Sequence, residues 1–210
     1  MRWAPIVGGA LAGLVAVPFL IAGIRATVER AWPVTVSRVL IVGLVAGVAG
    51  GVAFAGETSM ATSLVWWLAL VPGVAAAAVD LHEHRIPNRI LIPMIAAIAA
   101  VMLVAAIATG SWWPLARATL AGAGGFVLFY LTAMFTGLGY GDVKLVGVLS
   151  VAAAYQSLQA IASTLMLGWL LAGLLALVLL AVRRRDDPLP LAPSLLAGAG
   201  LSMVLLATVG

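Results

Sequence analysis

The chain has 210 residues, of which 64% are hydrophobic and only 9% are charged, and its mean hydropathy is +1.20. These values exclude an ordinary soluble domain and predict an integral membrane protein. The net charge is +4, but the basic residues are scattered over short connections, so we expect no nucleic-acid partner. The absence of cysteine excludes disulfide bonds, a thiolate nucleophile and a cysteine-ligated zinc site.

Long uncharged apolar runs recur along the chain, and each approaches the roughly 20 residues that a helix needs to cross about 30 Å of hydrocarbon. They lie at residues 4–24, 39–55, 61–79, 90–109, 118–136, 143–160, 162–182 and 191–209. We therefore predict an all-α, polytopic membrane helix bundle that forms a single integral membrane domain over residues 1–210, with about eight transmembrane helices.

The boundary between the sixth and seventh runs is the weakest. Residues 145–182 contain no charge and no proline, and one helix of that length would rise about 60 Å, twice the hydrocarbon thickness. A polar patch interrupts the stretch at Tyr155, Gln156, Ser157 and Gln159. We therefore expect a hairpin near residues 156–161 and two spans.

The positions of Lys and Arg predict the orientation of the bundle. With eight spans, nine basic residues fall on one side and two on the other. The nine are Arg25, Arg30, Arg38, Arg85, Arg89, Lys144, Arg183, Arg184 and Arg185, and the two are Arg2 and Arg117. This bias predicts that the nine face the cytoplasm and that both termini lie outside.

Residues 4–24 are too long for the apolar region of a signal peptide, so we interpret them as the first span.

Two further patterns fit a helical bundle. Tryptophans occur in pairs at the expected outer ends of spans, where we interpret them as anchors at the lipid headgroups: Trp66, Trp67, Trp112 and Trp113. Glycines at four-residue spacing allow helix backbones to approach closely, which we interpret as ordinary bundle packing: Gly9 and Gly13, then Gly43, Gly47 and Gly51.

No charge lies near the middle of a predicted span, which argues against a pump or coupled transporter, since proton and ion pathways need ionisable groups there. The polar residues gather instead in three connections on the cytoplasmic side, at residues 80–89, 137–144 and 183–187. A functional site would therefore face the cytoplasm.

Two aspartates stand out in these connections. Asp80 ends the run AAAAVD, and Asp142 follows Gly139 and Gly141 directly before an apolar run. Taken singly, Asp80 could be a solvated helix end and Asp142 a helix N-cap. Taken together, they lie on one face of the membrane at the edge of the hydrocarbon, where two carboxylates can share one proton and supply an acid and a base. This is the arrangement used by aspartic proteases.

Other polar groups allow weaker hypotheses. His82, Glu83 and His84 could suggest a metal, but histidines two apart do not share a helix face as in HExxH, so we expect an interfacial turn, no metal and no cofactor. The basic cluster at residues 183–185, followed by Asp186 and Asp187, is typical of contact with anionic lipid headgroups.

The segments VDLHEHRIPNRILIP and GLGYGDVKLVGVLS resemble the two signature segments of the type IV prepilin peptidases, which are polytopic aspartyl proteases of the GxGD class. Gly139 and Gly141 match the motif glycines, and Asp142 its aspartate. Asp80, followed by Arg85, Ile86 and Pro87, matches the first aspartate with its basic-Ile-Pro sequel. The resemblance is close over residues 74–160, with Lys144 inside the second segment. It is looser over residues 186–201, where LPLAPSLLAGA resembles a Pro-Phe-Gly-Pro stretch, and almost absent from the first 60.

The resemblance implies a peptidase of the cell membrane that uses Asp80 and Asp142 as catalytic residues. Its substrate would be a prepilin or pseudopilin precursor, cut at the cytoplasmic face between a basic leader and a hydrophobic helix. Residues 61–209 would form the peptidase core and residues 1–60 divergent N-terminal helices. Glu83, Asp186 and Asp187 could bind the basic leader.

This chain differs from many relatives, which also N-methylate the new terminus and carry two zinc-binding cysteine pairs in their first cytoplasmic loop. It has no cysteine and only a short connection at residues 25–38, so we do not expect methyltransferase activity. Two alternatives stay open: a non-catalytic membrane subunit of a pilus or secretion assembly, and a small transporter. The sequence does not specify an oligomeric state.

Overall fold

A computed structural model describes residues 3–28, 33, 35–55, 59–136, 139–182 and 190–209. Over these residues the chain forms nine α-helices. They are α1 (Trp3–Val15), α2 (Val17–Thr27), α3 (Val36–Val52), α4 (Met60–Glu83), α5 (Asn88–Thr109), α6 (Trp113–Thr136), α7 (Tyr140–Gln156), α8 (Leu158–Ala181) and α9 (Leu191–Val209). The predicted all-helical fold class is therefore confirmed.

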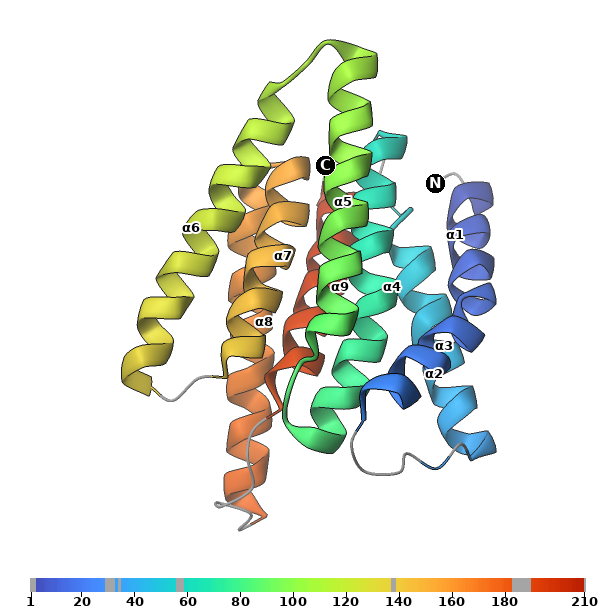
Figure 1. The fold of residues 1–210 in the computed structure, drawn as a ribbon, viewed down its shortest axis with the longest axis vertical. Helices are drawn as coiled ribbons and strands as arrows, with labels where there is room; N and C mark the ends of the chain where they lie inside the picture. Colours follow the sequence, from blue (N-terminus) through green and yellow to red (C-terminus); the bar gives the residue numbers. More distant parts are fainter. Residues whose placement is uncertain are drawn as a thin grey trace.

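The helices form one bundle in which successive segments run in alternating directions, with α1 and α2 as a bent pair at 41° (Figure 1). The C-terminal ends of α2, α4, α6 and α8 lie at one end of the bundle, and both chain termini lie toward the other end. Since Asp80 is in the last turn of α4 and Asp142 in the first turn of α7, the two aspartates share one end of the bundle.

Each predicted span corresponds to a helix, or to the bent pair for residues 4–24. In the described residues, five helices are long and apolar enough to cross a membrane. The number rises to six if the bent pair of α1 and α2 is counted as one span. Helices α3 and α7 have 17 residues each, at the lower limit of about 17–25 for a span. A polytopic membrane bundle is thus supported, while eight complete crossings with both termini outside stay a prediction.

The expected break between the sixth and seventh spans is confirmed. Helix α7 ends at Gln156 and α8 begins at Leu158, with Ser157 between them in an extended conformation (φ −164°, ψ 164°). The Ser157 hydroxyl accepts a hydrogen bond from the backbone N–H of Ala160 at 3.0 Å and so caps the start of α8. A serine in the polar patch therefore ends one helix and begins the next.

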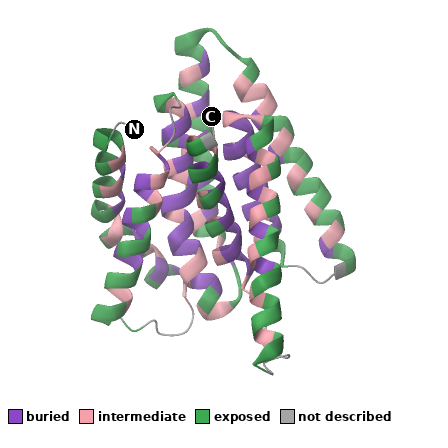
Figure 2. Ribbon diagram, turned by 180° about the vertical axis from the view of Figure 1, so that it is seen from behind, coloured by how far each residue is buried: buried purple, intermediate pink, exposed green. Residues whose placement is uncertain are grey.

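Burial divides the bundle into central and peripheral helices. Buried residues are concentrated in α4 and α7, whereas α5, α6 and α8 carry large exposed apolar side chains (Figure 2). Helix α4 packs against α3, α5, α7 and α9. The two helices that carry Asp80 and Asp142 are therefore the best enclosed, while the exposed apolar faces suit contact with lipid.

The tryptophans do not all behave as lipid anchors. Trp112 and Trp113 are exposed, as expected, but Trp66 is fully buried, so its interpretation as a headgroup anchor is wrong. An indole N–H inside a bundle needs an acceptor, and Trp66 finds one in Gln156 of α7 at 2.7 Å. Hydropathy predicts the position of a tryptophan along a span. It does not predict whether the side chain points into the bundle or toward the lipid.

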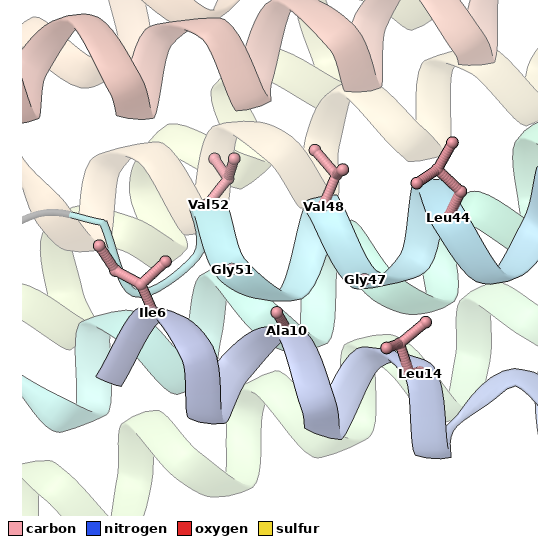
Figure 3. A pocket seen from close by; sticks show the side chains of 8 residues that line it. All are labelled: Ile6, Ala10, Leu14, Leu44, Gly47, Val48, Gly51 and Val52. Carbon is pink, nitrogen blue, oxygen red and sulfur yellow. The ribbon is translucent and has the colours of Figure 1, made fainter. Parts of the chain in front are cut away.

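Small residues bring α1 and α3 together, which agrees with the close helix packing expected at these glycines and identifies the two helices as partners. A Cβ atom added at Gly9 would collide with the backbone of Gly50, and one added at Gly13 with that of Ala46. Beside this contact lies an apolar groove of about 390 Å³ between α1 and α3 (Figure 3). It is lined by Ile6, Ala10, Leu14, Leu44, Gly47, Val48, Gly51 and Val52.

Candidate active site

Asp80 lies inside the protein, near the C-terminal end of α4. Asp80 is only 4% exposed. The Oδ2 atom of its side chain accepts a hydrogen bond from the backbone N–H of Ala192 at 3.1 Å. Ala192 is in the first turn of α9, where N–H groups lack partners within the helix and attract negative charge. The interpretation of Asp80 as a solvated helix end is therefore wrong, and this carboxylate joins α4 to α9.

The turn after Asp80 has a clear local cause. His84 ends α4 in the left-handed region (φ 52°) and donates its backbone N–H to the Asp80 carbonyl at 2.8 Å. Ile86 precedes a proline, which disfavours helical backbone there, and Pro87 is the N-cap of α5 with φ −79°. The sequence from His84 to Pro87 therefore stops one helix and starts the next close to Asp80.

Asp142 lies in the first turn of α7, before the apolar run at residues 143–160. Gly139, rather than Asp142, is the N-cap, so the alternative interpretation of Asp142 as a helix N-cap is wrong. The Oδ1 atom of Asp142 is buried without a hydrogen-bond partner, although its Oδ2 lies beside Gly139, where an added Cβ would approach it to 2.9 Å. An unpartnered carboxylate oxygen in a buried position is costly in its charged form, which favours the protonated state of this carboxyl group.

The two signature segments are in direct contact. An added Cβ on Gly141 would lie 2.9 Å from the Cβ and from the backbone nitrogen of Ile86. Nearby, Lys144 donates from Nζ to the Asn88 side-chain oxygen at 2.8 Å. Gly141 therefore permits a backbone approach that brings the start of α7 against the turn between α4 and α5.

This contact places the two carboxyl groups within electrostatic reach of each other. Burial, and secondarily the negative charge of Asp80, raises the pKa of Asp142 to about 7. Between about pH 4 and pH 7, Asp142 therefore keeps a proton that an isolated aspartate would have lost. The sequence expectation that these carboxyl groups gather at one end of the bundle agrees with this geometry.

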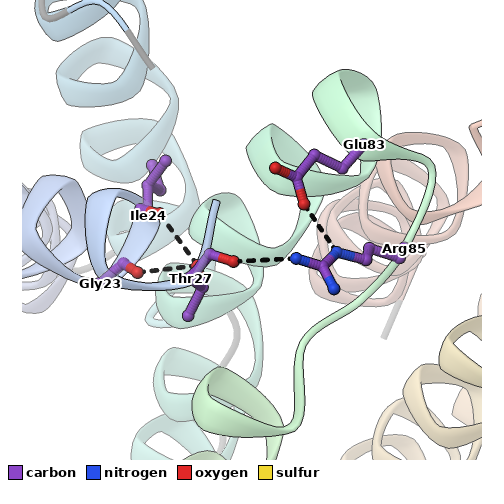
Figure 4. A network of polar contacts seen from close by, with 5 residues as sticks. All are labelled: Gly23, Ile24, Thr27, Glu83 and Arg85. Atoms are coloured by element: carbon purple, nitrogen blue, oxygen red, sulfur yellow. Dashed lines mark hydrogen bonds and ion pairs between the residues drawn. The ribbon is translucent and has the colours of Figure 1, made fainter. Parts of the chain in front are cut away.

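Glu83 and Arg85 belong to a polar network with α2 (Figure 4). Arg85 pairs with Glu83 at 2.6 Å between Nε and Oε2, and its Nη2 donates to the Thr27 carbonyl at 3.2 Å. Arg89 donates to the neighbouring Ala26 carbonyl at 2.9 Å. Two arginines thus donate hydrogen bonds to carbonyl groups at the C-terminal end of α2. The C-terminal end of a helix carries a partial negative charge, so it attracts positively charged side chains.

The network affects the expected leader contacts. The side chain of Glu83 is 7% exposed and points to Arg85, so little of it is free to meet a leader. The other two predicted acids, Asp186 and Asp187, lie outside the described residues, as does the basic cluster at residues 183–185.

The histidines of this connection lie at the end of α4. The Nε2 atom of His82 is buried without a hydrogen-bond partner, and His84 is the C-cap. Among the described residues, no three His, Asp or Glu side chains gather as a metal site would require.

The start of α9 leaves almost no trace in the sequence, although it contacts Asp80. The only signal was the loose resemblance at residues 189–199, and it carried no ionisable group that would attract notice. The structure brings this segment to the site through the backbone of Ala192, which is 112 residues from Asp80 in the chain. A backbone N–H is present at nearly every position, so its use leaves no compositional trace.

The chain is similar in sequence to a curated protein. A prepilin leader peptidase/N-methyltransferase of Bacillus subtilis (strain 168) is 33% identical over 131 residues, which cover 61% of this chain and 50% of that protein. The chain thus spans about half the length of this relative. No solved structure matches the chain significantly.

The model of the type IV leader peptidase family matches residues 62–182, more than half of the chain and the part that contains both aspartates. The chain therefore belongs to the type IV leader peptidase family.

Proposed function

We propose that this protein is a membrane-embedded aspartic endopeptidase that removes the leader of prepilin-like or pseudopilin precursors. The observation that supports it best is the placement of Asp80 and Asp142 at one end of the bundle, close enough for the charge of Asp80 to raise the pKa of Asp142. Asp80 is buried, and the Oδ1 atom of the half-buried Asp142 is buried as well. A non-catalytic assembly subunit would have no need to keep two carboxyl groups in such a costly arrangement.

The two carboxyl groups have different surroundings, which suggests different roles. Asp142, with a pKa of about 7, is the acid that donates a proton to the oxygen of the scissile carbonyl. Asp80 accepts the Ala192 N–H through one oxygen, and its other oxygen is the base that takes a proton from water. The oxygen of that water bonds to the carbonyl carbon, which gives a neutral diol.

Collapse of the diol restores both groups. The carbon–nitrogen bond breaks, the proton on Asp80 passes to the departing nitrogen, and a diol hydroxyl returns its proton to Asp142. The products are the leader with a carboxyl terminus and the mature chain with a free amino terminus. No cofactor is needed for this balance.

The family supports a prepilin-like substrate, and the distribution of basic residues supports the orientation. The nine-to-two distribution of Lys and Arg would place the aspartate end of the bundle at the cytoplasmic face of the cell membrane. There a precursor could present the junction between its basic leader and its hydrophobic helix, with that helix in the lipid. Residues 61–209 would be the peptidase core.

We further propose that the new amino terminus stays unmethylated. The basis is the absence of cysteine and the short connection at residues 25–38. Mass spectrometry of the mature product tests this, because a methylated terminus is about 14 Da heavier, the mass of one methylene added to the residue at the cut. A heavier product made by this protein alone would contradict the proposal.

The decisive experiment is cleavage of a prepilin by the purified protein. Asp80→Asn and Asp142→Asn should each lose nearly all turnover while melting like the wild type, and the double variant should be little worse, since residues that act as one unit are not additive. Asp→Glu at either position should also fail, because a displacement near 1 Å can cost about a hundredfold. Glu57→Gln, which removes a different acid, serves as the control. More than a few per cent of wild-type cleavage by either Asn variant would favour the assembly-subunit alternative.

A further inference from the structure

Three side chains form a polar contact at the end of the bundle away from the aspartates. The indole N–H of Trp66 donates to the side-chain oxygen of Gln156 at 2.7 Å. Arg117 of α6 donates to three successive backbone carbonyls in the last turn of α7, from Ala154 to Gln156, at 2.6, 3.0 and 3.1 Å. We call Trp66, Gln156 and Arg117 the distal clamp.

The distal clamp satisfies groups that would otherwise be costly. The last carbonyls of a helix have no partner within it, and a positive charge there complements the helix dipole. Trp66 is fully buried, so its N–H must find an acceptor inside the protein. The clamp therefore holds the C-terminal end of α7 against both α4 and α6.

The positions of the clamp and of the aspartates match along the two central helices. Asp80 lies fourteen residues after Trp66 in α4, and Gln156 lies fourteen residues after Asp142 in α7. Fourteen residues of α-helix rise about 21 Å. Because α4 and α7 run in opposite directions and pack against each other, a contact that sets Trp66 level with Gln156 also sets Asp80 level with Asp142.

Helix α4 is continuous from Met60 to Glu83, although Pro72 lies inside it between Trp66 and Asp80. A proline removes one backbone hydrogen bond and can bend a helix sideways, but the residues on both sides of it still rise along the helix. The height of Asp80 along the bundle therefore follows from the height at which Trp66 is held.

We propose that the distal clamp is a positioning device that sets the axial register of α4 against α7 and thereby the relative height of Asp80 and Asp142. It rests on the proposed function only in that these aspartates form the reacting pair. Trp66, Gln156 and Arg117 touch no substrate in this scheme and act through the two helices.

The first test measures geometry without activity. Because the chain contains no cysteine, Asp80→Cys with Asp142→Cys introduces the only two thiols, and a short bis-methanethiosulfonate reagent reports whether they are close. We expect efficient intramolecular cross-linking in the full-length protein. Adding Gln156→Leu, which removes the acceptor, should slow it at least tenfold.

Two matched variants separate the clamp from general damage. Gln156→Glu keeps the shape and the acceptor oxygen, so the cross-linking rate should stay within about twofold of the parent. Trp67→Phe removes the indole N–H of the neighbouring tryptophan. That N–H donates to the Gly9 carbonyl of α1 at 3.4 Å and not to α7, so this variant should leave the cross-linking rate unchanged. Equal rates with and without Gln156→Leu would overturn the clamp while leaving the aspartate pair in place. Failure of the parent pair to cross-link would overturn the aspartate geometry and the clamp with it.

The second test uses cleavage by the protein with both aspartates intact. Gln156→Leu should lower kcat at least tenfold with KM unchanged, because it shifts the reacting groups but not the substrate contacts. Gln156→Glu should restore most of kcat. A rise in KM with kcat unchanged, or an equal loss in Trp67→Phe, would contradict the positioning role.

Discussion

Gly141 and Ile86 lie in backbone contact, since a Cβ atom on Gly141 would approach both the Cβ and the backbone nitrogen of Ile86 to 2.9 Å. This contact joins the turn after Asp80 to the first turn of α7. A residue with a side chain would have to push the two segments apart, because backbone atoms cannot move aside as a flexible side chain can. Because Gly141 has no side chain, the start of α7 can lie directly against the turn that follows Asp80.

Gly141→Ala should reduce cleavage at least tenfold and lower the free energy of unfolding by about 1–3 kcal/mol, as overpacking does. Gly124→Ala in α6 is the matched control, since nothing lies within 4 Å of its added Cβ. It should leave cleavage unchanged. Steady-state cleavage and thermal melting of both variants decide the question, and wild-type kcat in Gly141→Ala would show that the close approach is dispensable.

The rate of cleavage should fall at alkaline pH. Because the pKa of Asp142 is raised to about 7, this group loses its proton above that pH and can no longer act as the acid. We expect kcat/KM to drop about tenfold per pH unit above roughly pH 7. A pH–rate profile at constant ionic strength measures this. A profile that stays flat to pH 9 would exclude Asp142 as the acid.

Asp142 should also make stability depend on pH. Between its ordinary pKa of 3.8 and the raised value of about 7, the folded protein keeps a proton that the unfolded chain releases. The folded state binds more protons in this window, so its stability falls as pH rises. Asp142→Asn removes this dependence, and its melting temperature relative to wild type should therefore be higher at pH 8 than at pH 4.5. Tryptophan fluorescence melts in detergent measure the difference. The same difference at both pH values would contradict the raised pKa.

If the proposed function holds, the acidic side chains of Glu83, Asp186 and Asp187 should contribute to leader binding, but unequally. Glu83 is paired with Arg85 and little exposed, so we expect most of the effect from Asp186 and Asp187. Exposed ion pairs contribute about 0–1 kcal/mol each and weaken with salt. Asp186→Lys with Asp187→Lys should raise KM for a basic leader about three- to tenfold at low salt with little change in kcat. An unchanged KM at low salt would remove these acids from leader binding.

Reporter fusions test the predicted orientation. Fusions after Arg38, Arg89, Lys144 and Arg185 should all report the cytoplasm, because each follows a segment on the side with nine basic residues. A fusion after Arg117 provides the contrast and should report the outer side. If any of the four reports the outer side, the number of spans is smaller than eight.

Several features of the fold were determined by the sequence alone. The bounds of the apolar segments agree with the helices, and the break at Ser157 falls within the polar patch that predicted it. The common end of Asp80 and Asp142 follows from the same count of alternating segments. These features depend on local properties, because the cost of a charge or an unpaired backbone group in hydrocarbon acts on each segment separately.

The tertiary structure decided which side chains meet. Trp66 was expected at the lipid headgroups, yet it is buried and donates a hydrogen bond to Gln156. Glu83 was expected to contact the leader, yet it is paired with Arg85. Asp80 is held by the backbone of Ala192, far away in the chain. Which face of a helix turns inward depends on how all its neighbours pack around it. In a sequence this rich in apolar residues every face is apolar, so the pattern fixes the length of each helix but not its rotation.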